Sequence, residues 1–130
     1  MADTRQSTSS AMRTGSVAVC AALYLAAFVL THLPPNRVPG GGLINDKLMH
    51  LVGYGGLGFA TMWTLAILRR RTPMRPGFFG AWGAMLCYAL FDESTQPIVG
   101  RSFEWSDLAA DATGAVLGLL LALLIVRRRG

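Results

Sequence analysis

Residues 107–126 read DLAADATGAVLGLLLALLIV, and Arg127 to Arg129 follow directly. A run of about twenty mainly apolar residues is long enough to cross the hydrocarbon core of a membrane as an α-helix. Asp107 and Asp111 stand at the start of this run. Carboxylates at membrane depth are costly unless they are paired or functional. The stretch therefore predicts a spanning helix whose first turns carry a polar site.

The composition of the whole chain agrees with a membrane protein. Of its 130 residues, 52% are hydrophobic and 15% are charged, whereas soluble domains carry roughly 25% charged residues. The length allows one domain. The net charge of +5 comes from short arginine blocks beside apolar runs, so the sequence predicts no nucleic-acid partner. Cys20 and Cys87 lie inside apolar runs without a CxxC spacing and are expected to be free thiols.

Three more apolar runs predict three more spanning helices. The expected spans are residues 15–33, 48–68, 77–96 and 107–126, within a domain of residues 15–130. Residues 1–14 are polar and are expected to form a disordered tail. A cleaved signal peptide is the alternative for the first run, which is longer than the usual apolar core of about 7–15 residues. The expected fold class is an all-α membrane protein, a four-transmembrane-helix bundle.

The basic residues indicate how this bundle is oriented. Most of them lie in the N-terminal tail, in the link at residues 69–75 and after residue 126. The other two connections carry only Arg37, Lys47 and Arg101. Lys and Arg are enriched in cytoplasmic loops. Both termini are therefore expected to be cytoplasmic, and the opposite end of the bundle is the outer one.

Counting along the expected helices places the ionisable groups at one depth. At a rise of about 1.5 Å per residue, His50 lies about 28 Å from Arg69. Asp111 lies about 24 Å from Arg127, and Asp92 reaches a similar height. The expected functional cluster in this outer layer comprises Asp46, Lys47, His50, Asp92, Glu93, Gln96, Arg101, Asp107 and Asp111. His32, beside Pro34, is expected to be an isolated interfacial residue.

The spacing of small residues indicates which way this layer faces. Asp111, Gly114 and Gly118 share one helix face. Small residues four apart allow two helices to approach closely in a membrane. The second expected span is also rich in glycine, at residues 53–58. The polar layer is therefore expected to point inward, with tight helix packing below it.

Three roles fit the layer. In a structural network, Lys47 and Arg101 neutralise carboxylates. In a ligand site, the same two cations attract an anionic group while Trp105 covers an apolar part. In a metal site, a divalent cation is bound and its water hydrolyses a substrate. The ligands for that third role are Asp46, His50, Asp92, Glu93, Asp107 and Asp111.

Sequence motifs do not choose between these roles. The chain has no HExxH motif, nucleophile elbow or phosphate loop. No cofactor is expected in the first two roles. A divalent metal is expected only in the third.

Three segments together resemble the signatures of the VanZ-like family. They are NDKLMH at residues 45–50, DESTQ at residues 92–96, and GRSF at residues 100–103 followed by DL at 107–108 and GAVLG at 114–118. The resemblance covers about residues 16–126. It implies a small multi-pass protein of the bacterial inner (cytoplasmic) membrane. The family is named after a member linked to resistance to the glycopeptide teicoplanin. Asp111 departs from the pattern, since the family commonly has Asn there.

The expected function is a non-enzymatic VanZ-like envelope protein that binds a lipid-linked or surface ligand at the outer polar site. Through the resemblance, this function includes a link to teicoplanin resistance. The alternative is a metal-assisted membrane hydrolase or transferase that acts on a lipid or envelope precursor. A purely structural or assembly role is the third hypothesis. The partners expected are membrane lipid and the lipid-linked or envelope ligand.

Overall fold

The computed structural model describes residues 2–37, 45–69 and 74–129, and all its regular elements in these ranges are helices. The long helices are α1 (Ala2–Thr31), α2 (Asp46–Leu68), α3 (Met74–Thr95) and α4 (Trp105–Arg129). Two short 3-10 helices are η1 (Pro35–Arg37) and η2 (Gln96–Val99). Within the described ranges, three helical segments are long and apolar enough to cross a membrane: Ser10–Thr31, Asp46–Leu68 and Trp105–Arg128. The all-α fold is confirmed, with helices at each of the four expected spans.

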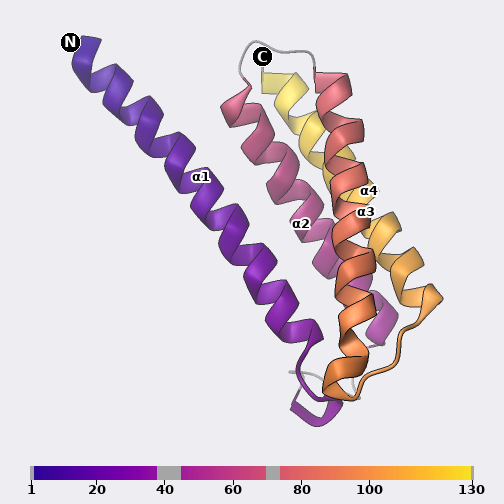
Figure 1. The fold of residues 1–130 in the computed structure, drawn as a ribbon. Helices are drawn as coiled ribbons and strands as arrows, with labels where there is room; N and C mark the ends of the chain where they lie inside the picture. Colours follow the sequence, from indigo (N-terminus) through magenta and orange to yellow (C-terminus); the bar gives the residue numbers. More distant parts are fainter. Residues whose placement is uncertain (1, 38–44, 70–73, 130) are drawn as a thin grey trace.

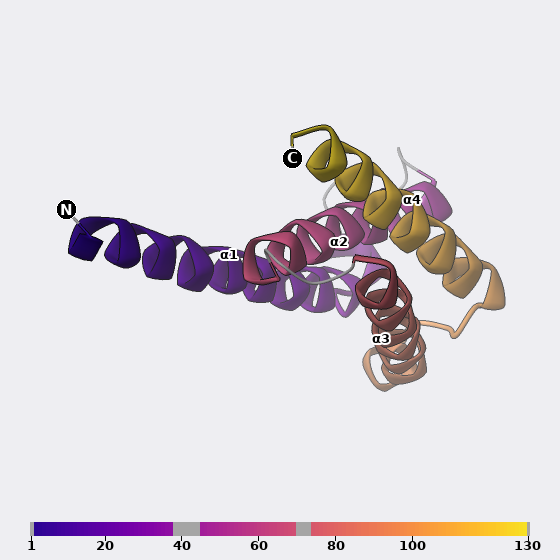
Figure 2. The same ribbon diagram turned by 90° about the horizontal axis from the view of Figure 1, so that it is seen from above.

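The helices run up and down along a common direction (Figure 1). The N-terminus and the C-terminus lie at the same end, and the chain passes from α3 to α4 at the opposite end. Seen from above, α2 lies among the other three helices, and α1 leans away from them towards its N-terminus (Figure 2). Helix α2 packs most extensively against α4 and next against α1. The bundle is therefore organised around α2.

The N-terminal segment differs from the prediction. Helix α1 begins at Ala2, whereas the sequence predicts a disordered tail for residues 1–14. A helix that has already formed extends at the gain of one hydrogen bond per residue. Residues 2–14 contain neither Pro nor Gly to stop that extension. The apolar run thus continues as one helix into the polar segment.

Glycines bring α2 and α4 into backbone contact. A Cβ atom at Gly114 would collide with the carbonyl oxygen of Leu51, and one at Gly118 with that of Gly55. A Cβ at Gly58 would lie 2.5 Å from the carbonyl oxygen of Ala115. Any larger side chain at these positions would push the two helices apart. The predicted close packing along Gly114 and Gly118 is confirmed.

The rest of the core lies on either side of this contact. Met62, Met85 and Leu119 are fully buried. Gly53 and Gly56 face open space and take no part in the α2–α4 contact. Only some of the glycines in the second helix therefore serve packing. The polar layer described below lies towards the end of the bundle where α2 and α4 begin and α3 ends.

We predict that Gly118→Ala destabilises the bundle. The added methyl group meets the backbone of Gly55, which cannot move without shifting α2. Overpacking of this kind costs about 1–3 kcal/mol. Thermal unfolding in detergent measures the loss. The control is Gly83→Ala in α3, where nothing lies within 4 Å of the new methyl group. Equal melting temperatures for the two variants would contradict the close contact.

Candidate functional site

The first turn of α2 starts the polar layer. Asn45 caps the helix, because its side chain accepts a hydrogen bond of 2.9 Å from the backbone N–H of Lys47. Such a cap satisfies an amide that would otherwise lack a partner. It fixes the position at which the helix begins. Asp46 and Lys47 consequently lie in the first turn and His50 one turn further on.

His50 meets carboxylates from two other helices. We call His50, Glu93 and Asp111 the buried triad; they come from α2, α3 and α4. The imidazole Nδ1 lies 2.9 Å from Asp111 Oδ1 and 3.8 Å from Glu93 Oε1. Glu93 and Asp111 are fully buried, each at 0% exposure. The close α2–α4 contact places His50 and Asp111 within hydrogen-bond distance.

Three other carboxylates have cationic partners: Asp46 and Glu104, which are exposed, and Asp107, which is buried. Lys47 Nζ lies 2.9 Å from Asp107 Oδ1 and 3.2 Å from Glu104 Oε2. The ammonium group of Lys47 lowers the pKa of Glu104, which lies just before α4. Arg101 Nη2 lies 3.3 Å from Asp46 Oδ2. The predicted neutralisation of carboxylates by Lys47 and Arg101 is present in this outer part of the layer.

A tight turn directs Arg101 back into the site. Gly100 closes η2 with φ +80°, a left-handed conformation that glycine adopts without steric cost. Arg101 then donates from Nε to Gln96 Oε1 at 3.1 Å. Gln96 in turn donates from Nε2 to Glu93 Oε1 at 2.8 Å. This chain of bonds connects the guanidinium group of Arg101 to the buried triad.

Asp92 belongs to a different neighbourhood from Glu93. Thr31 Oγ1 donates to Asp92 Oδ1 at 2.8 Å, and His32 Nδ1 lies 3.6 Å from the same oxygen. The hydroxyl of Tyr54 lies 3.5 Å from the other oxygen. Asp92 thus faces α1 rather than the buried triad. The structure brings the predicted residues together in one layer but divides them into separate groups.

The sequence did not predict that residues at the end of α1 contribute to the polar layer. His32 is not isolated, since its Nε2 lies 2.9 Å from the hydroxyl oxygen of Thr95. The helical rise from Arg13, counted as for the other spans, predicts that His32 belongs to the layer. At about 1.5 Å per residue, His32 lies about 28 Å from Arg13, in the same layer as the other polar groups.

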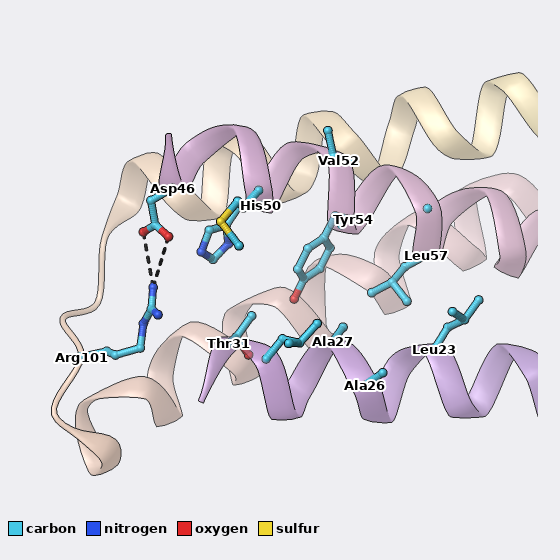
Figure 3. Close-up of a pocket in the computed structure, with 14 residues that line it drawn as sticks. Leu23, Ala26, Ala27, Thr31, Asp46, His50, Val52, Tyr54, Leu57 and Arg101 are labelled. Carbon is cyan, nitrogen blue, oxygen red and sulfur yellow. Dashed lines mark hydrogen bonds and ion pairs between the residues drawn. The ribbon is translucent and has the colours of Figure 1, made fainter. Parts of the chain in front are cut away.

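A groove between α1 and α2 ends at this layer (Figure 3). Its volume is about 330 Å³. Apolar side chains line most of it, among them Leu23, Leu30 and Val52, whose outer parts remain exposed. The ion pair between Asp46 and Arg101 lies at the polar end, with the Arg101 side chain reaching towards α2 (Figure 3). The groove is thus apolar along most of its length and charged at one end.

Long apolar helices around a buried polar layer define a helical membrane protein. The family can be stated as well. The family model VanZ/LLP1 matches residues 22–126, so the chain belongs to this family. The resemblance seen in the sequence motifs is confirmed. Comparisons with curated proteins and with solved structures found no match.

We predict that Thr31→Val destabilises the protein, because the change removes a hydrogen-bond donor from the buried carboxylate of Asp92. Loss of a partner from a buried polar group costs about 1–3 kcal/mol. Thermal unfolding in detergent measures the change. Thr113→Val is the matched control, because Thr113 is exposed and, among the described residues, its hydroxyl bonds to the carbonyl of Ala109 in its own helix alone. Wild-type melting temperatures for both variants would contradict a stabilising hydrogen bond from Thr31 to Asp92.

Proposed function

We propose that the chain is a multi-pass protein of the bacterial cytoplasmic membrane that binds a lipid-linked ligand at the polar end of the α1–α2 groove. Four helices span the membrane and both termini are cytoplasmic. The apolar part of the ligand occupies the groove. An anionic head group lies beside Arg101. The protein acts by binding.

The length of α3 supports a fourth span. Its 22 residues extend about 33 Å, close to the thickness of the hydrocarbon core. Asp92 and Glu93 lower its mean hydropathy, but both carboxylates are buried against protein. They therefore place no charge in lipid. The arginines at residues 69–75 and after residue 126 support a cytoplasmic location for that end of the bundle.

The groove is the observation that carries the binding proposal. Leu23, Leu30 and Val52 line it and are still partly exposed. In a membrane they face the acyl chains. A lipid tail can therefore enter from the side without crossing water. The groove leads this tail towards the layer that contains Arg101.

The ion pair at the polar end suits an anionic head group. The Asp46 side chain is 52% exposed and lies 3.3 Å from Arg101 Nη2. The Arg101 side chain is 12% exposed, so the pair is partly exposed rather than buried. Pairs that stay in contact with water contribute less to stability than fully buried ones. A phosphate can therefore replace the carboxylate as the partner of Arg101 at small cost. Bidentate hydrogen bonding makes arginine a favoured partner for phosphate.

Binding explains the site better than the alternative, a metal-assisted hydrolase or transferase. Metal-assisted hydrolysis needs an activated water within reach of the scissile bond. Glu93 and Asp111 are fully buried, and His50 is the one member of the triad that lines the groove.

Teicoplanin resistance stays a prediction from the family. The inhibitory concentration for a host with and without the protein tests it.

We predict the topology from single cysteines placed in a Cys20→Ser/Cys87→Ser background. Ser102→Cys lies at the outer end and is exposed, so a membrane-impermeant maleimide should label it in intact cells. Ser10→Cys and Arg128→Cys are exposed at the other end and should react only after permeabilisation. The reversed labelling pattern would contradict the proposed orientation.

We predict that a long-chain alkyl phosphate binds more tightly than the alcohol of the same chain length. Native mass spectrometry of the protein in detergent measures both. Arg101→Gln should weaken phosphate binding about tenfold or more, as expected for a hydrogen bond to a charged group. Binding of the alcohol should be unchanged, because Arg101 contacts only the head group.

A second pair of variants tests the groove itself. Ala26→Phe fills the groove, which Ala26 lines, and should weaken binding of both compounds. Ala109→Phe on the exposed face of α4 is the control and should bind as the wild type does. Equal affinity for phosphate and alcohol, together with no effect of Arg101→Gln, would overturn the proposed head-group site.

A further inference from the structure

The two carboxylates of the buried triad lack a lysine or arginine partner among the described residues. Among the described residues, Asp107 is paired with Lys47 and Asp46 with Arg101. Glu93 and Asp111 contact no lysine or arginine in that part of the chain, and His50 is their shared ionisable neighbour. Buried carboxylates are stable only when they are paired, protonated or bound to a metal. The triad therefore needs additional positive charge.

Asp111 provides a second observation that is independent of this count. Its Oδ1 faces His50 Nδ1, whereas its Oδ2 is buried and has no hydrogen-bond partner within residues 2–37, 45–69 and 74–129. Buried polar atoms without a partner are rare in native proteins. A bound cation would give this unpartnered oxygen a partner and would also supply the positive charge that the triad lacks.

The geometry of the triad fits a metal ion. One ligand atom from each of His50, Glu93 and Asp111 lies within 4.8 Å of the other two. Ligand atoms that surround a cation at about 2.0–2.2 Å lie roughly 3–4 Å apart. Small side-chain shifts thus bring all three atoms to bonding distance. Because the ligands come from three helices, the ion would bind α2, α3 and α4 together.

The neighbours hold the ligands in place. Glu93 accepts hydrogen bonds from the Gln96 amide at 2.8 Å and from the backbone N–H of Glu104 at 3.2 Å. The other ring nitrogen of His50 lies 3.9 Å from Asp107 Oδ2, which is too far for a hydrogen bond here, but a small side-chain shift brings the two atoms within range. When Nδ1 binds a metal, the ring proton is on Nε2 and faces that carboxylate. Carboxylates and amides commonly orient metal ligands in this way.

We propose that His50, Glu93 and Asp111 bind one first-row divalent cation, such as Mn²⁺ or Zn²⁺. An imidazole ligand favours these ions over Mg²⁺ and Ca²⁺, which prefer sites made of oxygen atoms. A second group, Asp46, His50 and Asp107, has similar spacing. It is the weaker candidate, because the carboxylates of Asp46 and Asp107 already have Arg101 and Lys47 as partners.

Mn²⁺ titration tests this site. The full chain is purified in detergent, its affinity tag is removed, and bound metal is stripped with EDTA. Electron paramagnetic resonance of free Mn²⁺ then gives the stoichiometry and the Kd. We expect one ion per chain. Glu93→Gln and Asp111→Asn should each weaken binding about 100-fold or more, beyond the 10–100-fold typical of supporting residues.

Two further variants separate this site from its alternatives. Asp46→Asn keeps the triad and should bind Mn²⁺ as the wild type does. Gln96→Ala keeps all three ligands but removes a bond to Glu93, so it should bind about 10–100-fold more weakly. If a triad variant does not elute as a single species, Gln96→Ala still tests the assignment. Saturating Mn²⁺ should also raise the melting temperature of the wild type but not of Glu93→Gln.

The proposal is overturned if the wild type binds neither Mn²⁺ nor Zn²⁺. It is also overturned if Glu93→Gln and Asp111→Asn bind as tightly as the wild type, or if Asp46→Asn loses the ion while they keep it. Failure of the metal proposal in any of these ways would leave the lipid proposal unaffected. Loss of alkyl phosphate selectivity with Mn²⁺ binding intact would contradict the lipid site alone.

Discussion

The backbone contact between α2 and α4 is the constraint on which the site depends. Gly114 and Gly118 touch the carbonyl oxygens of Leu51 and Gly55 without a side chain between them. In a membrane, packing of this kind replaces the hydrophobic effect as the force that joins helices. One helical turn further along, the same approach brings His50 to 2.9 Å from Asp111. Close packing and the polar site are thus two consequences of one interface.

The carboxylates of the polar layer differ in their exposure to water and in their partners. Asp46 and Glu104, near the surface, are paired with Arg101 and Lys47 and remain partly in water, and the buried Asp107 is also paired with Lys47. Glu93 and Asp111 are fully enclosed and rely on neutral donors and on His50. Exposed pairs exchange partners easily, whereas enclosed carboxylates require a fixed positive partner. This difference supports a ligand site at the rim and a cation site beneath it.

The sequence predicted the helices and the polar layer because both depend on local signals. Apolar length and the arginines mark the spans, and the rise per residue gives the depth of each charge. The sequence did not predict that the side chains of Asp92 and Glu93 belong to different groups of the layer. Neighbours on a helix point about 100° apart, so Asp92 turns to Thr31 and Glu93 to Gln96. Which face meets which helix depends on three-dimensional packing, as does the groove beside α1.

The ring nitrogens of His50 provide the most direct test of the account. With ¹⁵N-labelled histidine, the protein has two imidazoles, and His32→Gln assigns them. In EDTA, Asp111→Asn should shift the Nδ1 resonance of His50, because it replaces the charged carboxylate 2.9 Å away with a neutral amide. Asp46→Asn should leave that resonance in place. A His50 spectrum that is insensitive to Asp111→Asn would contradict the convergence of α2 and α4 at the polar layer.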